Sequence, residues 1–328
     1  MKHTIIAAGL ICLSGAAFAQ QPVLTVYTYD SFASDWGPGP QVEAAFEAEC
    51  ACDVQFVTAG DGAALLARIR LEGAGSDADI VLGLDTNLTH AATDTGLFAA
   101  HGIQAEGLTL PIEWSDPQFL PFDWGYFAFV HNADLENVPA NFTELAQSDA
   151  RIVIQDPRSS TPGLGLLMWI DAAYGEDAAM IWDGLADNIV TVTPGWSEAY
   201  GLFLEGEADM VLSYTTSPAY HLIAEEDASK AAALFDEGHY MQVEVAGVLA
   251  NSDQRELATA FLEFMVGETF QTIIPTTNWM YPAALAAEAL PDGFETLIQP
   301  QDALLLSPEE AAMRRDAALE TWQTALSQ

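Results

Sequence analysis

Basic residues are scarce in this chain. Lysine and arginine together number 9, against 48 aspartate and glutamate residues, which gives a formal net charge of −39. Because such a surface repels phosphate backbones and attracts cations, binding to nucleic acid is excluded. The acidic residues are scattered rather than clustered, which favours a role in keeping the protein soluble at high salt. At most, this charge biases the ligand toward a cation.

Long hydrophobic runs are also lacking beyond the N-terminus. The first 20 residues combine a basic Lys2, an apolar run over Ile5–Leu13 and a small-x-small site. This pattern predicts a secretory signal peptide over residues 1–19, with the mature chain beginning at Gln20. The run is too short to span a membrane, and no later segment is long and apolar enough. We therefore expect a soluble, exported protein.

Cysteine is nearly absent from the expected mature chain, which keeps only Cys50 and Cys52. The two could form a disulfide in an oxidising compartment, but a ring that encloses a single residue is small and strained. Without a nearby histidine they make a poor metal site. A structural or inert role is expected, and whether they bond stays open.

Catalytic motifs are missing as well. The sequence has no nucleophile elbow, no His-Glu-x-x-His pair, no phosphate-binding P-loop and no dinucleotide fingerprint. Five of the histidines are dispersed, and none stands at metal-ligand spacing from another: His90, His101, His131, His221 and His239. A binding protein is favoured over an enzyme, although catalytic groups can converge from distant positions.

Half of the residues are hydrophobic, so the chain folds, and its apolar segments alternate between strand and helix patterns. This alternation is typical of α/β units with parallel strands. The predicted strands are 24–29, 54–57, 78–83, 123–130, 152–154, 209–212 and 240–250, and the predicted helices are 42–49, 63–72, 163–174, 198–204, 257–265 and 308–326. The long strands 123–130 and 240–250 are suited to crossing between two lobes. We expect two α/β lobes joined by these crossing hinge strands, with a small solute bound between the lobes.

The segment from 208 to 220, ADMVLSYTTSPAY, is the most informative part of the chain. Its apolar run Met210–Leu212 ends abruptly in hydroxyl residues, with Pro218 just beyond. In open α/β sheets, ligands bind at the carboxyl ends of strands and near helix N-termini. Alternatively, Ser217 only caps a helix that begins at Pro218. The residues leave both interpretations open.

Other candidate ligand groups lie at the ends of predicted strands or the starts of predicted helices. The Asp61 carboxylate, beside Gly62, either accepts a hydrogen bond from a ligand amine or caps the following helix. The Ser160 and Thr161 hydroxyls at a helix start suit an anion, or simply cap that helix. Tryptophans on turns are less easily explained as core than helical ones. The candidate stacking surfaces are Tyr29, Trp36, Trp196 and Trp279.

Several long blocks of the sequence resemble the thiamine-binding members of the periplasmic solute-binding proteins that serve bacterial ABC importers. The blocks run in order from residue 24 to residue 281: LTVYTYDSFASDWGPGP, DADIVLGLD, PFDWGYFAFV, QDPRSSTPGLGLL, GWSEAYGLFL, LSYTTSPAYH and TNWMYP. The resemblance implies a type II periplasmic-binding fold with lobes formed by 20–123 plus 243–284 and by 124–242 plus 285–328. It also implies capture of thiamine or its mono- and diphosphate in the periplasm, and delivery to the permease subunits of an ABC importer.

The resemblance further implies which residues contact the ligand. The matched contact positions are Asp61, Gly62, Ser160, Thr161, Trp196, Tyr214, Thr215, Thr216 and Ser217, and the matched aromatic cleft positions are Tyr29, Trp36, Tyr220 and Trp279. Aromatic faces suit the pyrimidine and the cationic thiazolium. Asp61 is expected to accept a hydrogen bond from the pyrimidine amino group, and the hydroxyls to bind a phosphate. Arg158 is the only nearby base, so how firmly a diphosphate is held stays open.

Two alternatives remain beside a thiamine carrier. Related two-lobed proteins bind ferric iron through paired tyrosinates, for which Tyr214 and Tyr220 are the candidates, but no His or Glu pattern completes a coordination sphere. Related folds also include exported enzymes that act on thiamine-like pyrimidines through a nucleophilic cysteine, whereas both cysteines here lie away from the cleft segments. We therefore expect a monomeric, non-enzymatic carrier without a cofactor or metal.

Overall fold

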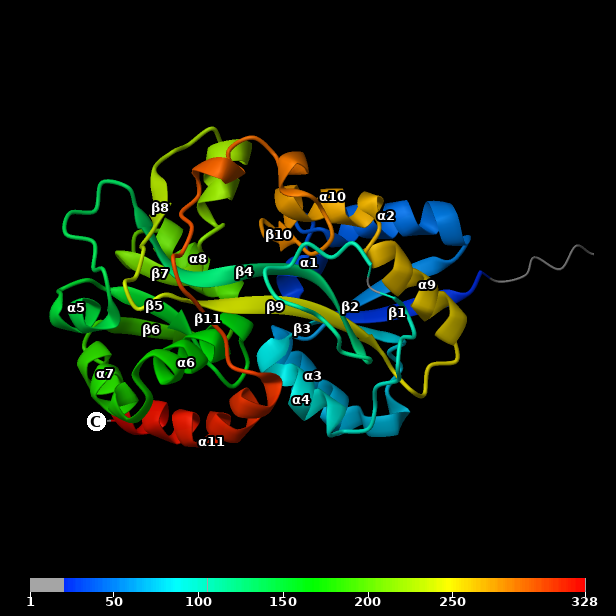
Figure 1. The fold of residues 1–328 in the computed structure, drawn as a ribbon, viewed down its shortest axis with the longest axis horizontal. Coiled ribbons are helices and arrows are strands. Elements are labelled where there is room, and N and C mark those ends of the chain that lie inside the picture. The colour runs from blue at the N-terminus through cyan, green and yellow to red at the C-terminus, as the bar shows by residue number, and fades with distance from the viewer. Residues whose placement is uncertain (1–20, 105, 328) are drawn as a thin grey trace, which may run out of the picture.

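The computed structural model describes residues 21–104 and 106–327, and its main strands form one mixed sheet in two halves (Figure 1). The strand order is β2-β1-β3-β9-β4-β7-β5-β6. The predicted signal peptide, residues 1–19, lies outside the described residues. No single described helix is long and apolar enough to cross a membrane; one bent helix pair, Arg255–Met265 with Glu268–Thr277, reaches that length and composition together.

The first half of the sheet holds three parallel strands near the N-terminus. Strand β1 (Val23–Thr28) lies between β2 (Asp53–Thr58) and β3 (Ile80–Asp85). Its helices are α1 (Asp30–Ala33), α2 (Gly39–Cys50), α3 (Gly62–Glu72), α4 (Thr86–Thr93), α9 (Arg255–Met265) and α10 (Glu268–Thr277). The carboxyl ends of the three strands therefore point the same way, as the α/β pattern predicts.

The second half repeats this arrangement with later strands. Strand β5 (Ile152–Gln155) pairs in parallel with β6 (Ile189–Thr193) and β7 (Met210–Tyr214). Its helices are α5 (Phe142–Gln147), α6 (Thr161–Tyr174), α7 (Ala178–Leu185), α8 (Trp196–Leu204) and α11 (Pro308–Ala325), with a π-helical turn at Tyr220–Ala224. Short pieces complete the fold: β8 (Lys230–Ala232), β10 (Tyr281–Pro282), β11 (Ala303–Leu304) and 3-10 turns at Gly73–Gly75, Gly175–Asp177, Ala287–Ala289 and Phe294–Thr296.

Two long antiparallel strands join the halves. Strand β4 (Phe119–Asn132) pairs with β7, and β9 (His239–Val248) pairs with β3, while β4 and β9 pair with each other across the middle (Figure 1). The expectation of crossing strands is confirmed. A register shift after Pro121 places Asp123 opposite Glu244. Of the three predicted lobe boundaries, 123/124 and 242/243 lie in these two strands and 284/285 follows Pro282; all three stay a prediction.

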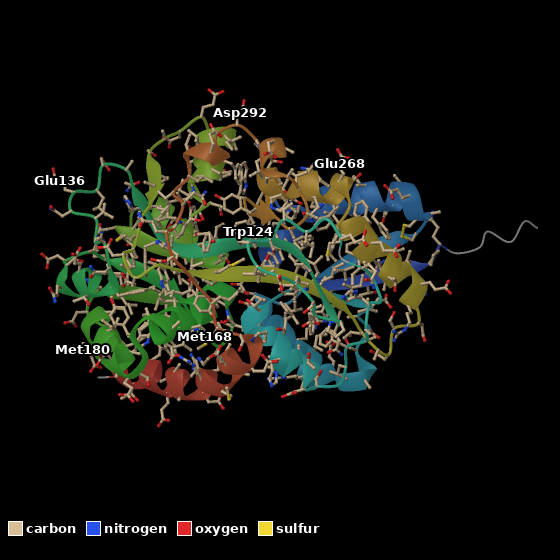
Figure 2. All side chains as sticks on the ribbon, in the orientation of Figure 1. Trp124, Glu136, Met168, Met180, Glu268 and Asp292 are labelled. Carbon is tan, nitrogen blue, oxygen red and sulfur yellow. A yellow bond between two sulfur atoms is a disulfide. The ribbon has the colours of Figure 1, made fainter. Side chains whose placement is uncertain are left out.

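The core is apolar on both sides of the sheet, and charged side chains gather at the outside. Helix α6 is buried from Thr161 to Ile170, as expected for a helix that is apolar all round. Charged side chains such as Glu136, Glu268 and Asp292 project from the outline of the molecule, whereas Met168 lies inside it (Figure 2).

The C-terminal helix α11 contacts both halves. It packs against α6 and α7 of the second half and against α4 of the first half. Its start confirms the predicted cap: the Ser307 Oγ accepts a hydrogen bond from the Glu310 N–H (3.2 Å), and the Glu310 Oε2 accepts one from the Ser307 N–H (3.0 Å). The resemblance assigns this helix to the second lobe alone, but it also packs on the first half.

The main elements lie within a few residues of their predicted bounds, whereas α1, α4, α5, α7, α10, β6 and the short strands were not predicted. Helix α10 is the clearest omission from the predicted helices, because Pro275 within it removes a backbone donor and disfavours a helix. Packing overrides that preference. Phe270 and Ile274 are buried, and the buried Gln271 amide donates to the carbonyls of Phe122 (3.0 Å) and Met265 (2.8 Å).

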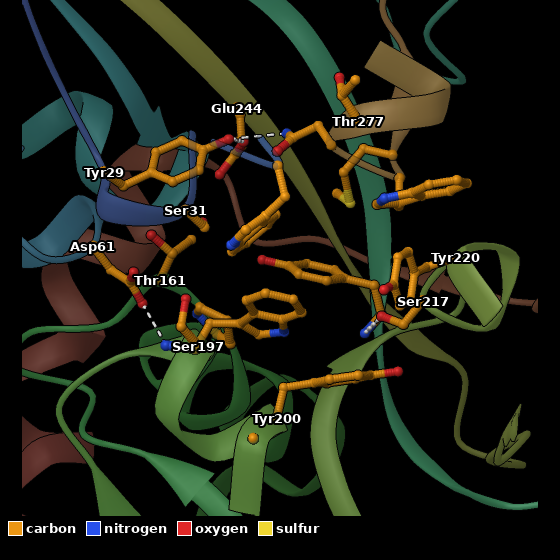
Figure 3. Close-up of a pocket in the computed structure, with 18 of the residues that line it drawn as sticks. Tyr29, Ser31, Asp61, Thr161, Ser197, Tyr200, Ser217, Tyr220, Glu244 and Thr277 are labelled. Carbon is orange, nitrogen blue, oxygen red and sulfur yellow. Dashed lines mark hydrogen bonds between the residues drawn. The ribbon is translucent and has the colours of Figure 1, made fainter. Parts of the chain in front are cut away.

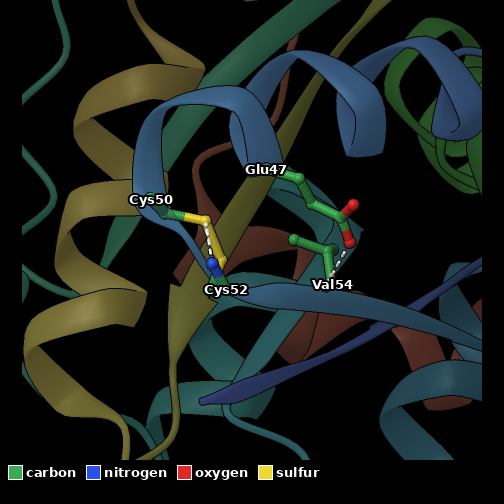
Figure 4. The surroundings of a disulfide bond; sticks show 4 residues. All are labelled: Glu47, Cys50, Cys52 and Val54. Atoms are coloured by element: carbon green, nitrogen blue, oxygen red, sulfur yellow. Dashed lines mark hydrogen bonds between the residues drawn. A yellow bond between two sulfur atoms is a disulfide. The ribbon is translucent and has the colours of Figure 1, made fainter. Parts of the chain in front are cut away.

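Cys50 and Cys52 form a disulfide at the junction between α2 and β2 (Figure 4). Next to it, the Glu47 side chain accepts a hydrogen bond from the Val54 N–H (2.9 Å), which ties the helix to the start of the strand. The open question of whether these cysteines bond is answered by this pairing. Neither cysteine lines the cavity described below.

Candidate functional site

A cavity of about 500 Å³ opens between the two halves of the sheet, at the carboxyl ends of β1 and β7 (Figure 3). The residues that line it combine aromatic rings, hydroxyls and two carboxyls. They include Tyr29, Ser31, Trp36, Asp61, Thr161, Trp196, Ser197, Tyr200, Tyr214, Ser217, Tyr220, Glu244, Thr277, Asn278 and Trp279. In the described part of the chain, no lysine, arginine or histidine lines it. The cavity thus offers flat faces and negative groups for one small molecule.

Aromatic rings from both halves form the walls. Trp36 of the first half and Trp196 of the second lie 6.2 Å apart between ring centroids, and Trp196 stacks on Tyr200 at 5.0 Å. Farther along, Tyr220 meets Trp279 edge to face at 5.5 Å. Trp36 is 55% exposed and Tyr220 36% exposed, although large aromatic side chains ordinarily pack inside. Both therefore leave ring surface free for a flat ligand.

Trp279 adopts a backbone conformation that bulky residues avoid. Its φ is +56°, and it follows the last residues of α10, where its N–H donates to the Ile274 carbonyl (3.1 Å). Glycine is the usual residue at this left-handed position after a helix. A tryptophan there costs backbone energy, and such strained residues cluster at functional sites. The side chain is therefore held at the cavity at a cost in stability.

Three helix N-termini meet at one end of the cavity: those of α3, α6 and α8. Asp61 precedes α3, Ser160 precedes α6 and Gly195 precedes α8. Asp61 Oδ2 accepts hydrogen bonds from Ser160 Oγ (2.6 Å) and from the Trp196 N–H (3.2 Å). Neither Asp61 nor Ser160 caps its own helix. The capping alternatives are therefore wrong for both residues, because each side chain reaches across to the other half instead.

The same end of the cavity brings the two halves into close contact. The Gly62 N–H donates to Thr161 Oγ1 (3.1 Å), and the Ala64 N–H donates to the Ser159 carbonyl (3.0 Å). A Cβ at position 62 would lie 2.6 Å from both Thr161 Oγ1 and the Gly83 carbonyl oxygen. Glycine is thus required at this position for the halves to approach.

Burial raises the pKa of Asp61 to about 6, despite the hydrogen bonds from Ser160 and the Trp196 N–H, which oppose the shift. The partial positive charge of three helix N-termini suits an anion. In this structure the Asp61 carboxyl is the acidic group that lies at these three helix N-termini.

Hydroxyl groups at the end of β7 hold Trp196 of the aromatic wall in place. The Trp196 indole N–H donates to Ser213 Oγ (2.8 Å), which also bonds Ser217 Oγ (2.7 Å). Ser217 Oγ in turn accepts from the Tyr214 N–H (3.1 Å). The interpretation of Ser217 as a helix cap is wrong, because its hydroxyl turns back to the strand and the residues beyond Ala219 form a π-helical turn.

Behind the aromatic wall lies a second layer of hydrogen-bonded side chains that the sequence did not predict. His221 contacts Tyr200 Oη through Nε2 (3.0 Å) and Glu225 through Nδ1 (2.7 Å), and Tyr220 Oη donates to Glu225 (3.0 Å). This series of hydrogen bonds connects Tyr220 to Tyr200 and fixes both rings. With Asp227, the His221 and Glu225 side chains lie close enough to hold a metal ion, but both His221 nitrogens are already engaged. One signal in the sequence was available: Tyr200 follows Trp196 by four residues on one helix face.

The floor of the cavity is acidic, and this too was missed. Glu244 lines the cavity from β9, and Asp123 lies opposite it on β4. Tyr29 Oη donates to Glu244 Oε2 (2.9 Å). The signal in the sequence was an acidic residue in the middle of the apolar strand YMQVEVAGVLA.

The structure brings most of the predicted site residues together. Those that line the cavity are Tyr29, Trp36, Asp61, Thr161, Trp196, Tyr214, Ser217, Tyr220 and Trp279. Those outside its lining are Gly62, Ser160, Thr215 and Thr216, all of them buried. Arg158 pairs with Asp156 and lies over the Trp322 ring, so it is not a cavity residue. Ligand contact by each of these residues stays a prediction.

Comparison with known proteins shows similarity over nearly the whole chain. The family model described as "Bacterial extracellular solute-binding protein" matches residues 36–272. A "Thiamine-binding periplasmic protein" of Escherichia coli (strain K12) is 55% identical over 97% of this chain and 98% of its own. The protein of the same name from Haemophilus influenzae is 41% identical over 100% and 99%.

Solved structures agree with these sequence similarities. A structure titled "Periplasmic thiamin binding protein" superposes with a TM-score of 0.92 at 55% identity, covering 94% of this chain and 97% of that one. Iron-bound HitA from Pseudomonas aeruginosa has a TM-score of 0.75 at 20% identity, covering 93% and 99%. The second likeness shows the fold alone.

Proposed function

We propose that this chain, which belongs to the bacterial extracellular solute-binding protein family and to its thiamine-binding periplasmic group, captures thiamine or a thiamine phosphate in the cavity between its halves. The observation that carries the proposal is the set of groups around that one cavity. Aromatic faces, buried carboxyls and three helix N-termini complement a flat pyrimidine, a cationic ring and an optional phosphate.

The aromatic residues hold the two rings of the ligand. Trp36, Trp196, Tyr220 and Trp279 present ring faces from both halves, so the solute is enclosed when the halves approach. A cationic thiazolium gains cation–π attraction at such faces. Tyr29 and Tyr214 complete the enclosure.

Asp61 has two possible partners in this proposal. Its carboxylate accepts a hydrogen bond from the pyrimidine amino group. Alternatively, a ligand phosphate displaces the Asp61 carboxylate from its hydrogen bonds with Ser160 and the Trp196 N–H at the helix N-termini. Of the hydroxyls predicted to bind a phosphate, those of Thr161 and Ser217 line the cavity, and these two, with the backbone N–H groups at the helix N-termini, are proposed to receive it. An ionised Asp61 repels that phosphate, so the unphosphorylated vitamin is the preferred ligand.

The protein acts as a monomeric carrier in the periplasm, exported by its N-terminal segment, and delivers its solute to the permease subunits of an ABC importer. It uses no cofactor and catalyses no reaction. The alternative of a cysteine-dependent enzyme is disfavoured because Cys50 and Cys52 are bonded to each other and do not line the cavity. The ferric alternative is disfavoured because the Tyr220 hydroxyl is bonded to Glu225 rather than directed at Tyr214.

Calorimetric titration of the mature chain with thiamine, thiamine monophosphate and thiamine diphosphate tests the proposal. Binding of at least one of them with a Kd below about 1 μM is expected. Chromatography of the ligand after prolonged incubation is expected to recover it unchanged. Failure to bind all three, or turnover of thiamine, would overturn the assignment.

A further inference from the structure

Two carboxyl groups face each other at the floor of the cavity, on the two strands that join the halves. Glu244 on β9 lines the cavity and is 5% exposed, and Asp123 on β4 lies opposite it and is fully buried. Carboxyls are rarely buried without a cationic partner. The cavity therefore contains a pair of acids that the proposed hydrogen bonds of the ligand do not explain.

The neighbours of this pair supply hydrogen bonds but no positive charge. Tyr29 Oη donates to Glu244 Oε2 (2.9 Å), and Asn278 Nδ2 donates to Asp123 Oδ2 (2.6 Å) and to Tyr29 Oη (2.9 Å). Asp123 Oδ1 has no hydrogen-bond partner among the described residues. Hydrogen bonds therefore hold both carboxyls in place, and one buried acceptor, Asp123 Oδ1, is unsatisfied.

The other titratable groups that face the pair are acidic too. Asp85, at the end of β3, acts on Glu244. Tyr214 on β7 lies within reach of the charges of Glu244, Asp123, Asp85 and Asp61. Arg315 of α11 acts on Asp85, and no lysine, arginine or histidine of the described residues lines the cavity beside the pair. Two adjacent buried negative charges without a cation are costly.

A proton on the pair removes this cost when the cavity is empty. Burial raises the pKa of Glu244 well above its ordinary value, and the charge of Asp123 raises it further. Burial also raises the pKa of Asp123, against the hydrogen bond from Asn278. Because the two groups interact strongly, the proton belongs to the pair rather than to either residue.

We propose that the Glu244–Asp123 pair is the cation-recognition subsite of the cavity, and that it releases its shared proton to solvent when a positively charged ring enters. The protonated pair and the cation thus become an ionised pair that holds the cation, plus one free proton. This inference rests on the proposed capture of thiamine and adds the element that selects a cationic solute over a neutral one of the same shape.

Calorimetry on the mature wild-type chain, in buffers that differ in ionisation enthalpy, counts the protons directly. At neutral pH, where Asp61 with its pKa of about 6 is largely ionised already, we expect about one proton released per thiamine bound. The affinity should rise with pH until the free pair is ionised. Thiamine binding without proton release would overturn the inference while leaving the proposed function intact. Absence of thiamine binding would instead overturn the proposed function.

Three variants locate the proton and separate charge recognition from packing. Glu244→Gln keeps an acceptor for Tyr29 but removes the charge, so proton release should be lost and thiamine affinity should fall by roughly tenfold or more. Asp61→Asn should still release the proton, because it leaves the pair intact. Glu256→Gln, an identical exchange at an exposed position of α9, should change neither quantity.

A neutral thiophene analogue of thiamine, in which carbon replaces the charged ring nitrogen, is the discriminating ligand. Glu244→Gln should bind this analogue within about threefold of the wild type, because packing is unchanged. Equal losses for the cationic and neutral ligands, or proton release that disappears in Asp61→Asn and persists in Glu244→Gln, would overturn the inference. Asp123→Asn provides a second variant of the pair, with loss of proton release expected.

Discussion

Trp196 is held at both ends by groups from different parts of the chain. Its backbone N–H donates to Asp61 of the first half, its indole N–H donates to Ser213 on β7, and its ring stacks on Tyr200. A side chain fixed in this way presents its face to a ligand with little loss of conformational entropy. At the scale of single residues, the site is therefore pre-organised by polar contacts behind its aromatic surface.

Truncating an aromatic wall tests this organisation. Trp196→Ala or Tyr220→Ala should weaken thiamine binding by about 1–3 kcal/mol, because buried aromatic contacts dominate binding energy. Titration calorimetry measures the change. Tyr220→Phe is the matched control: it keeps the ring and loses only the hydroxyl bonded to Glu225. Wild-type affinity in both alanine variants would count against an aromatic cage.

Asp61 should make the stability of the protein depend on pH in a definite direction. Its pKa is raised from 3.8 to about 6, so the folded state binds more protons than the unfolded state between these values. Stability from this group is therefore greatest at low pH and is lost as pH rises through about 6, by roughly 2–3 kcal/mol in total.

The difference between wild type and Asp61→Asn isolates that contribution. Urea unfolding of both proteins at several values between pH 4 and pH 7 measures this difference. The contributions of Asp85, Asp123 and Glu244 cancel in it, because these groups are present in both proteins. The stability of the wild type relative to the variant should decline as pH rises. A difference that stays constant with pH would show that Asp61 is not perturbed by burial.

At the scale of elements, the ends of helices and strands carry the site. The N-termini of α3, α6 and α8 converge, the end of β7 anchors the indole of Trp196, and the end of α10 projects Trp279. Strand ends and helix starts have free backbone groups and no fixed side-chain period, so they can be specialised for binding while the element interiors stay apolar.

The end of α10 offers a test that separates backbone stability from ligand binding. Position 279 has a φ of +56°, so Trp279→Gly should be more stable than Trp279→Ala by about 1 kcal/mol. Both variants lose the ring and should bind thiamine more weakly than the wild type. Urea unfolding and titration calorimetry measure the two effects. A glycine variant less stable than the alanine variant would contradict the left-handed conformation.

At the scale of the whole molecule, two features link the halves. Hydrogen bonds from Ser160 and Trp196 to Asp61 link the halves at one end of the cavity, and α11 packs against helices of both halves. The β4–β9 pair runs between them and carries the acidic floor. A solute in the cavity therefore contacts both halves and the strands that connect them.

The acidic surface has its own consequence for stability. With a formal charge of −39, the folded protein repels itself, and dissolved salt screens that repulsion. Raising sodium chloride from about 10 mM to about 500 mM should therefore raise the melting temperature. Scanning calorimetry with sucrose at matched osmolality as the control separates screening from solute exclusion. A melting temperature that falls with added salt would contradict this account.

Much of the architecture was predictable because local patterns determine it. Alternating strand and helix segments, two long extended segments and the hydroxyl residues after Leu212 all follow from residue periods and types. Exposed tryptophans on turns also stood out. Helix α10 was not predicted, because Pro275 disfavours a helix locally and the burial of Phe270, Gln271 and Ile274 that stabilises it is a tertiary effect.

The sequence by itself thus determined the two-half α/β architecture, the crossing strands and most of the cavity aromatics. Only the tertiary structure decided that Asp61 and Ser160 bond each other rather than cap helices, and that Asp123 faces Glu244. The physical reason is that a sequence pattern records which side of an element is apolar but not which distant residue lies opposite. Strand register and the packing of the halves set those partners, and they place the acids at the floor of the cavity.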